Sequence, residues 1–270
     1  MNRSSVSRFS VLCLLAVASV SFAQTGGEKA AAAAAAAPRL ADGHPDLSGV
    51  WWGGADVGAR GSRPPGPPAA GAPRPVTFTS LYQPSVAAKA ATLSDKDDPT
   101  LKCVPTAFGT LNVRLWNVGA VGQIVATPKM VVLLSETFHD FQLVPTDGRP
   151  HRDDQPPTYR GDAVGRWDGD TLVVDVTNFT DDTWMSAEGR VSPHSDALHI
   201  VERYTRISKD RIDYEVTMED PNVLTQPWQL RSSLMLREGT RLSEYICAEN
   251  NVDLDRYERL LKNGVDFTRK

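Results

Sequence analysis

Short apolar segments separated by turn residues dominate this sequence from about residue 120 onward. Val, Ile, Leu, Thr and Tyr are frequent there, and turn signals recur about every ten residues, a pattern typical of an all-β meander. The predicted strands are Val121–Thr127, Met130–Thr137, Phe138–Pro145, Ala163–Trp167, Thr171–Asn178, Leu198–Ile207, Arg211–Glu219, Gln229–Arg237 and Arg241–Cys247. Consecutive hairpins favour a closed or nearly closed antiparallel barrel, and a two-sheet sandwich is the alternative.

Turn residues fix the expected hairpins. Asp168-Gly169 is a type I′ signal, and Lys209-Asp210 and Glu238-Gly239 are further two-residue turns. Upstream, the segment Leu47–Trp52 predicts a strand that buries large aromatic surface, and residues 80–95 have a composition that suits one short helix.

The N-terminal segment has the features of a secretory signal peptide. Two arginines precede an apolar run over Phe9–Val20, and Ser21-Phe22-Ala23 supplies the small residues of a cleavage site. The run is too short to cross a bilayer, and a buried N-terminal helix is the alternative. We therefore expect an exported protein, periplasmic or extracellular, without a membrane span.

The rest of the chain divides by composition. An Ala-rich linker over 24–45 precedes the barrel domain at 46–252, which contains a Pro-rich loop at 60–75. Proline removes donors and fixes φ, so this loop cannot hold regular structure. The tail at 253–270 is compatible with a helix.

Removing the signal peptide leaves two cysteines, Cys103 and Cys247. In an oxidising compartment they predict one structural disulfide. A pair of buried thiols or a shared metal ion are the alternatives, but no CxxC or HxxxH spacing accompanies either cysteine, so we expect no metal.

Charge and motifs exclude several function classes. The net charge of −4 makes a general electrostatic grip on nucleic acid or anionic lipid improbable. The sequence has no Walker loop and no Gly-x-Gly-x-x-Gly, so no nucleotide cofactor is expected, and we predict no cofactor of any kind. His194 and Ser195 are adjacent, but adjacent residues rarely form a nucleophile–base contact and no Gly-x-Ser-x-Gly elbow is present.

The Lys209-Asp210 hairpin predicts which side chains face inward. Apolar residues alternate with polar ones along Arg211–Glu219, which places Tyr214 inside. A two-residue turn then pairs this strand so that His199, Arg203 and Thr205 also face inward. Because a charged side chain cannot lie unpaired in a dry core, we expect them to line a wet cavity or to meet carboxylates.

The Asp168-Gly169 hairpin offers such carboxylates. Its expected register places Asp162 opposite Asp175, with Arg166 on the same face. Whether this face points inward or to solvent stays open. Glu136 is a further candidate, because it ends an apolar strand where a carboxylate is unexpected.

Several motifs occur in a fixed order: Pro45-Asp-Leu-Ser-Gly-Val-Trp51, Gly165-Arg-Trp-Asp-Gly-Asp-Thr-Leu-Val-Val-Asp175 and Glu244-Tyr-Ile-Cys-Ala-Glu-Asn250. The set resembles a large family of secreted, mostly uncharacterised bacterial proteins whose domain is similar to a lipocalin or calycin β-barrel. The resemblance implies a barrel with an internal small-molecule site, and it implies no reaction.

Our leading hypothesis is an exported barrel that binds a small organic molecule in a partly polar interior. Its expected ligand contacts are Arg203, Tyr214, Thr205, Arg166 and Glu136. An acid–base enzyme using the same cavity, a hydro-lyase, isomerase or cyclase, is the alternative, with His199, Asp162 and Asp175 as catalytic residues. A second alternative is an envelope interaction module without a ligand site. The oligomeric state is not predicted.

Overall fold

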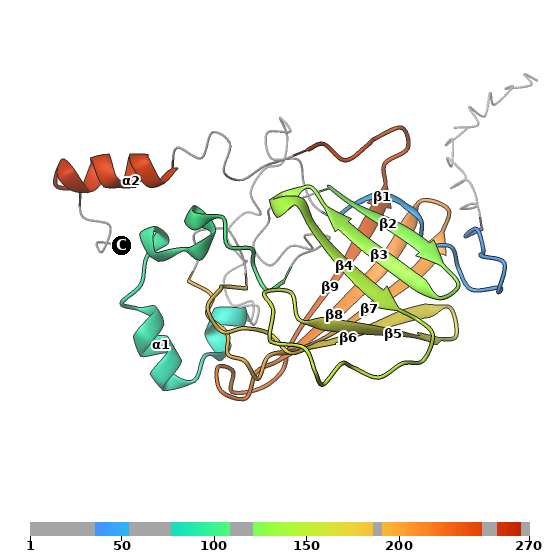
Figure 1. Ribbon diagram of the computed structural model, residues 1–270, viewed down its shortest axis with the longest axis horizontal. Coiled ribbons are helices and arrows are strands. Elements are labelled where there is room, and N and C mark those ends of the chain that lie inside the picture. The colour runs from blue at the N-terminus through green and yellow to red at the C-terminus, as the bar shows by residue number, and fades with distance from the viewer. Residues whose placement is uncertain (1–35, 54–76, 109–120, 186–190, 245–252, 266–270) are drawn as a thin grey trace, which may run out of the picture. The chain divides into compact units, whose positions relative to one another are not determined.

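The computed structural model describes residues 36–53, 77–108, 121–185, 191–244 and 253–265, and the described strands form a nearly closed antiparallel barrel (Figure 1). The all-β barrel predicted from the sequence is thereby confirmed. The strands are β1 Gly49–Trp52, β2 Val121–Thr127, β3 Met130–Ser135, β4 Asp140–Pro145, β5 Asp162–Asp168, β6 Thr171–Thr177, β7 His199–Ser208, β8 Arg211–Glu219 and β9 Trp228–Leu236.

The strand order around the sheet is β4-β3-β2-β1-β9-β8-β7-β6-β5. Two local meanders, β2 to β4 and β5 to β9, are joined by β1, which pairs with β9 only through Trp51↔Leu236 and Trp52↔Met235. The edge strands β4 and β5 meet by close packing, because a Cβ added to Gly165 would lie 2.8 Å from Val144 Cγ1. This contact closes the barrel on its second side.

Helices are short. The helix expected over 80–95 is confined to α1, Pro84–Ala90, where proline occupies the first turn as it does in many helices. Single 3₁₀ turns flank it at Phe78–Leu81, Asp95–Asp97 and Pro99–Lys102. In the C-terminal tail, α2 covers Asp253–Lys262. Among the described residues, no helix has the length and apolar character needed to span a membrane.

Most predicted strand bounds agree with the structure to within a few residues, and the exceptions have local causes. The chain turns between β3 and β4 because Phe138 and His139 adopt left-handed backbone angles. Residues 241–244 of the last predicted strand are not in a strand, and residues 245–247 lie outside the described part. The signal peptide, the Pro-rich loop and Cys247 also lie outside it, so the predictions that rest on them, including the disulfide, stay predictions.

The register of β7 differs from the prediction by one residue. Ser208 pairs with Arg211 as expected for the turn, but a β-bulge follows, so that Arg206 pairs with Ile212 and the offset persists along the strand. One inserted residue moves every later side chain to the other face. The prediction that His199, Arg203 and Thr205 face inward is therefore wrong.

A buried arginine accompanies this bulge. The guanidinium of Arg206 lies 4.9 Å from the ring centroid of Trp51 and donates to the backbone carbonyls of Asp46, Ser208 and Lys209. Burial lowers the pKa of Arg206. The side chain thus binds the chain before β1 to the β7–β8 turn.

The β5–β6 hairpin also differs from the prediction, because the two turn residues are Gly169 and Asp170. Gly169 supplies the positive φ at the first turn position, and Asp168 pairs with Thr171. Asp162 therefore lies opposite Thr177, and Asp175 lies opposite Val164. The interior face of this hairpin carries Ala163, Gly165, Leu172, Val174 and Val176, so the carboxylates point outward.

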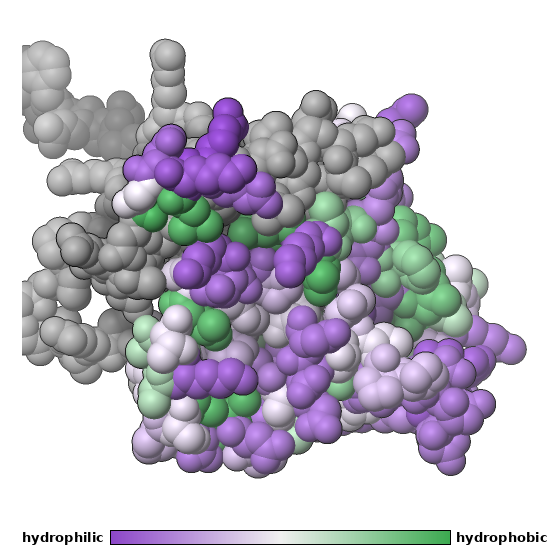
Figure 2. All heavy atoms as spheres, turned by 60° about the vertical axis from the view of Figure 1, so that its left-hand side comes forward, coloured by the Kyte–Doolittle hydropathy of each residue, from purple (hydrophilic) through white to green (hydrophobic). Residues whose placement is uncertain are grey.

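The outer surface is mixed in character. On the face seen in Figure 2, hydrophobic residues lie in separate groups among hydrophilic ones. Among the residues that the structure describes, the most exposed large apolar side chains are Phe141 and Leu143, both on the outer face of β4.

Candidate functional site

A carboxylate that was not among the predicted site residues lies inside the barrel. Glu202 on β7 is buried, and its Oε1 accepts hydrogen bonds from the hydroxyls of Tyr214 at 2.6 Å and Tyr204 at 3.0 Å. The two tyrosine rings meet edge to face with centroids 5.0 Å apart. Tyr214 therefore faces inward as predicted, and its partner is a carboxylate of the neighbouring strand.

Burial raises the pKa of Glu202, while hydrogen bonds from Tyr214 and Tyr204 and the charge of Arg160 oppose that rise. The same burial, together with the nearby carboxylate, raises the pKa of both tyrosines well above the ordinary value. Glu202 is thus an interior acid whose proton is held more tightly than in water.

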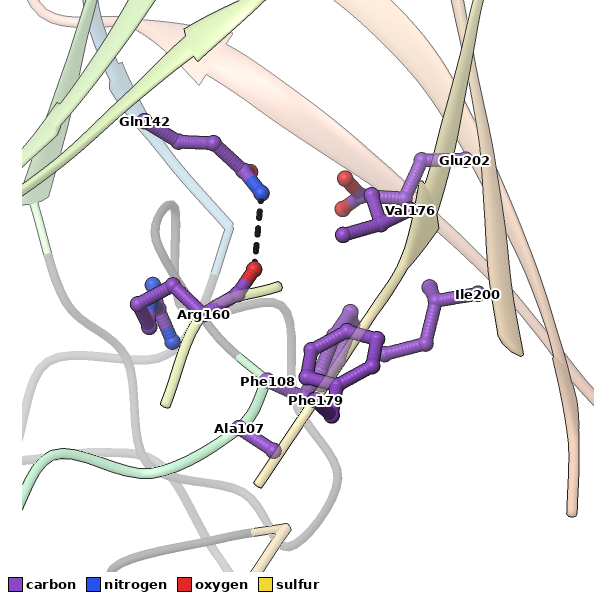
Figure 3. Close-up of a pocket in the computed structure, with 8 residues that line it drawn as sticks. All are labelled: Ala107, Phe108, Gln142, Arg160, Val176, Phe179, Ile200 and Glu202. Atoms are coloured by element: carbon purple, nitrogen blue, oxygen red, sulfur yellow. Dashed lines mark hydrogen bonds between the residues drawn. The ribbon is translucent and has the colours of Figure 1, made fainter. Parts of the chain in front are cut away.

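A small void borders Glu202 at one end of the barrel, and Figure 3 shows the residues around it. Gln142 donates from Nε2 to the backbone oxygen of Arg160 across one side, and the side chains of Phe108 and Phe179 lie across another. The void has a volume of about 10 Å³, which is room for about one water molecule. We call it the Glu202 void.

The three predicted catalytic residues do come together, but on the outer face. Asp175 Oδ1 lies 3.0 Å from His151 Nε2 and 3.1 Å from His199 Nε2. The other nitrogen of His151 lies 3.0 Å from Asp162 Oδ2, and Glu219 lies 3.6 Å beyond His199. We call this chain of alternating carboxylates and imidazoles the outer His–Asp network.

The network fastens the chain that precedes β5. Arg152 donates to Asp162 from both its backbone and its side chain, at 3.1 and 2.7 Å. Burial opposes ionisation of Asp162, but the hydrogen bonds from Arg152 and His151 outweigh it and hold its pKa below the ordinary value. Neither the Glu202 void nor the larger cleft described below is lined by a member of the network. The contacts of the network therefore have a structural role, which is to hold the chain before β5 against the barrel.

Three of the remaining predicted ligand contacts lie near one another on the outer face of the barrel, and Glu136 lies apart from them at the connection between β3 and β4. Arg203 pairs with Asp168 at 2.8 Å, and Thr205 hydrogen-bonds Thr171 across the outer face. Arg166 is exposed on the same side, and Glu136 accepts the backbone N–H of Ser243 at 2.6 Å. These four side chains do not form a common site.

A larger cavity of about 390 Å³ lies at the barrel end where β6 and β8 finish, and we call it the end cleft. Its apolar walls come from α1 and the loops around it. The lining residues are Val86, Lys89, Leu93, Pro99, Asp181, Asp182, Thr183, Trp184, Pro193, His194, Ser195, Asn222 and Val223. This volume lies within the usual range for small-molecule sites.

Backbone hydrogen bonds hold the walls of the end cleft in place. Gln83 donates its backbone N–H to Val223 O at 2.8 Å, which joins the start of α1 to the loop after β8. Ala107 donates to Trp184 O at 2.9 Å, and Thr183 Oγ1 donates to Pro105 O at 2.5 Å. The cleft is therefore built from segments that are fixed to one another.

Asp220 organises the floor of the cleft. This carboxylate is 1% exposed and accepts the backbone N–H of Ser195 at 2.7 Å and its hydroxyl at 2.8 Å. Ser195 Oγ in turn accepts from Asn222 Nδ2 and from the backbone of Ala197. The serine hydroxyl is thus fully used in structural hydrogen bonds, and it makes no contact of a nucleophile with a base.

His194 is the unusual member of the cleft. Its Nδ1 donates to Ser195 O at 3.1 Å, which leaves Nε2 as an acceptor. Nε2 is buried and has no hydrogen-bond partner within the described ranges. Burial lowers the pKa of His194, against the charges of Asp220, Asp181 and Asp182, so the neutral ring is favoured. An unpartnered buried acceptor of this kind costs roughly 1–3 kcal/mol.

A single layer of side chains separates the end cleft from the Glu202 void. Phe179 lines the void and packs edge to face on His194, with ring centroids 6.2 Å apart. Ala107 lines the void as well and is hydrogen-bonded to Trp184 of the cleft. The end cleft and the buried Glu202 therefore lie on opposite sides of this layer of side chains.

Metal-ligating side chains do not converge in the part of the chain that the structure describes: no group of three or more His, Cys, Asp or Glu is placed to hold an ion. In the outer His–Asp network, the imidazole nitrogens point at carboxylate oxygens and serve as hydrogen-bond partners.

Sequence reasoning did not single out Glu202 or Arg160, and it considered His194 only as a partner for Ser195. Glu202 alternates in phase with Tyr204 and Ile200, so its inward position follows from the strand pattern once the bulge is known. His194 follows a proline in a loop, and no local pattern indicates its burial.

Comparisons with known proteins add no family to this description. No family model, no curated protein and no solved structure matches the chain.

Proposed function

We propose that this protein binds a small organic molecule in the end cleft. The observation that carries the proposal is the combination of a cavity of about 390 Å³ with apolar walls and one buried acceptor, His194 Nε2, that lacks a partner among the described residues. Ligand sites characteristically combine apolar walls with a few well-placed polar groups. The proposed site lies at the end of the barrel, whereas the sequence-based hypothesis placed it in the interior.

Filling the cleft tests the proposal. Val86 lies half-buried on α1 and lines the cleft, so Val86→Trp should occupy the site with little strain on the barrel core. Val125 on the outer face of β2 is 39% exposed, so Val125→Trp is the matched control. We expect a small molecule that co-purifies from the native host to be found by mass spectrometry with wild type and with the control, and to be lost from Val86→Trp. Retention of the molecule by Val86→Trp would refute the assignment.

The acid–base alternative gains less support. His199, Asp175 and Asp162 are close enough to exchange protons, but each is engaged by another member of the network or by Arg152. The cleft has its own imidazole, His194, so proton transfer there would use that ring. Enzymatic turnover that persists in the His194→Phe variant would exclude proton transfer by His194.

We further propose that the chain is exported after removal of residues 1–23 and that Cys103 and Cys247 form a disulfide. Sequencing the N-terminus of the mature protein checks the first statement. Mass spectrometry after thiol alkylation, with and without reductant, checks the second, and two alkylated cysteines without reductant would contradict it.

A further inference from the structure

We propose that the end cleft selects an organic cation, a small amine in its ammonium form that carries an apolar body. This inference rests on the proposed function and names the class of ligand. The first observation is the charge of the cleft wall, to which Asp181 and Asp182 bring two carboxylates and Lys89 brings one ammonium group.

The two carboxylates are available to a ligand. Within the described residues, neither Asp181 nor Asp182 has a Lys, Arg or His within ion-pair distance, and Asp182 shares one oxygen with the hydroxyl of Thr180 at 2.5 Å. Asp168, in contrast, is paired with Arg203. The cleft wall therefore presents uncompensated negative charge beside its apolar surface.

A third carboxylate strengthens this field. Asp220 is buried behind Ser195 of the cleft wall, and its charge acts on His194 together with those of Asp181 and Asp182. Since the hydrogen bonds that Asp220 accepts come from neutral groups, they leave its negative charge uncancelled. An anionic ligand would meet two carboxylates and one lysine at the cleft wall, with the buried Asp220 behind it, so it is disfavoured.

Hydrogen-bond complementarity points to the same class. An ammonium group offers three donors and no acceptor, which matches the carboxylate oxygens that Asp181 and Asp182 bring to the cleft wall. The apolar body of the ligand would pack on Val86, Leu93 and Val223. A neutral alcohol satisfies the walls and one acceptor but leaves the carboxylates without a counter-charge.

Three probes with the same benzene ring and short arm separate these cases: phenethylamine, phenethyl alcohol and 3-phenylpropionate. We expect calorimetry and ligand-observed NMR on the full chain at low ionic strength to show phenethylamine binding about tenfold tighter than the alcohol, with the propionate weakest. Binding of the amine should weaken as salt is added, because the carboxylates are exposed to solvent.

Variants assign the preference to residues. Asp181→Asn with Asp182→Asn should lower the affinity for phenethylamine about tenfold and leave that for the alcohol unchanged. Asp153→Asn with Asp154→Asn removes the same charge from an exposed segment outside the cleft and should change neither. Equal binding of amine and alcohol, or tighter binding of the propionate, overturns the ammonium inference and leaves small-molecule binding standing. Binding of none of the three, with no co-purifying molecule, overturns both.

Discussion

Replacing Glu202 by Gln tests whether the barrel interior contains a titrating carboxyl group. Burial raises the pKa of Glu202 above its ordinary value of 4.5. The unfolded chain therefore releases this proton near the ordinary value, whereas the folded protein keeps it to higher pH. Because the folded state binds more protons in this window, the free energy of unfolding of wild type must fall as pH rises from 4.5 to the raised pKa.

The size of the effect follows from one proton. A difference of one bound proton changes the free energy of unfolding by about 1.4 kcal/mol per pH unit. The amide of Glu202→Gln does not titrate, and its oxygen can still accept from the tyrosine hydroxyls. The stability of Glu202→Gln relative to wild type should therefore rise by about 1.4 kcal/mol for each pH unit across the window and then level off.

Tyr214→Phe should move the upper limit of this pH window to a higher pH. It removes the 2.6 Å donor that stabilises the carboxylate, so it should raise the pKa of Glu202 further. Loss of a hydrogen bond to a charged group should also lower stability by about 1.5–3 kcal/mol where Glu202 is ionised. Tyr159→Phe removes a hydroxyl from an exposed side chain outside the barrel interior and is the control.

Urea denaturation measured at intervals from about pH 4 to about pH 8, with unchanged m-values, supplies these free energies. The reasoning is refuted if the difference between wild type and Glu202→Gln is the same at every pH. It is refuted as well if the stability of Glu202→Gln relative to that of wild type falls as pH rises, since that sign requires a lowered pKa.

Three further predictions concern stability. Gly165→Ala should lower the free energy of unfolding by about 1–3 kcal/mol in urea denaturation, because its Cβ would lie 2.8 Å from Val144 Cγ1. Adding Val144→Ala should restore part of the loss. A Gly165→Ala variant as stable as wild type would contradict the close packing of β4 against β5. Arg206→Met leaves buried carbonyls without donors and should lower stability by about 2–4 kcal/mol, with Arg206→Lys intermediate, whereas a stability like that of wild type would show the arginine to be dispensable. A double-mutant cycle of His151→Gln and Asp175→Asn should give a coupling of about 0.5 kcal/mol, as both groups are partly exposed, and strict additivity would argue against the contact.

The fold was largely predictable because alternation and turn residues are local signals. The bounds of β2 and β8 were predicted to the residue, and the Lys209-Asp210 turn lies where it was expected. The faces of β7 were not predictable from the same signals. A bulge adds one residue without changing composition, and its cause here includes contacts of Arg206 with a segment far away in the chain.

The candidate site was less predictable than the fold. Tyr214 was placed correctly because it lies on a strand with clean alternation, but its partner Glu202 depended on the face of β7. The grouping of Asp162 with Asp175 was anticipated from their hairpin, whereas His151, which joins them, comes from a loop. The end cleft is built from loops and α1, where no periodic pattern shows which side chains converge.

The narrow joint between β1 and β9 has a consequence for how the chain acquires this fold. Hairpins within β2 to β4 and within β7 to β9 join strands that are close in sequence, so they close short loops and can form early. Trp51 and Trp52 instead meet residues near the other end of the domain, through two pairs only. Closing so long a loop for so few pairs is entropically unfavourable until both meanders exist. We therefore expect barrel closure to follow the formation of both meanders, with the β1 strand captured between them.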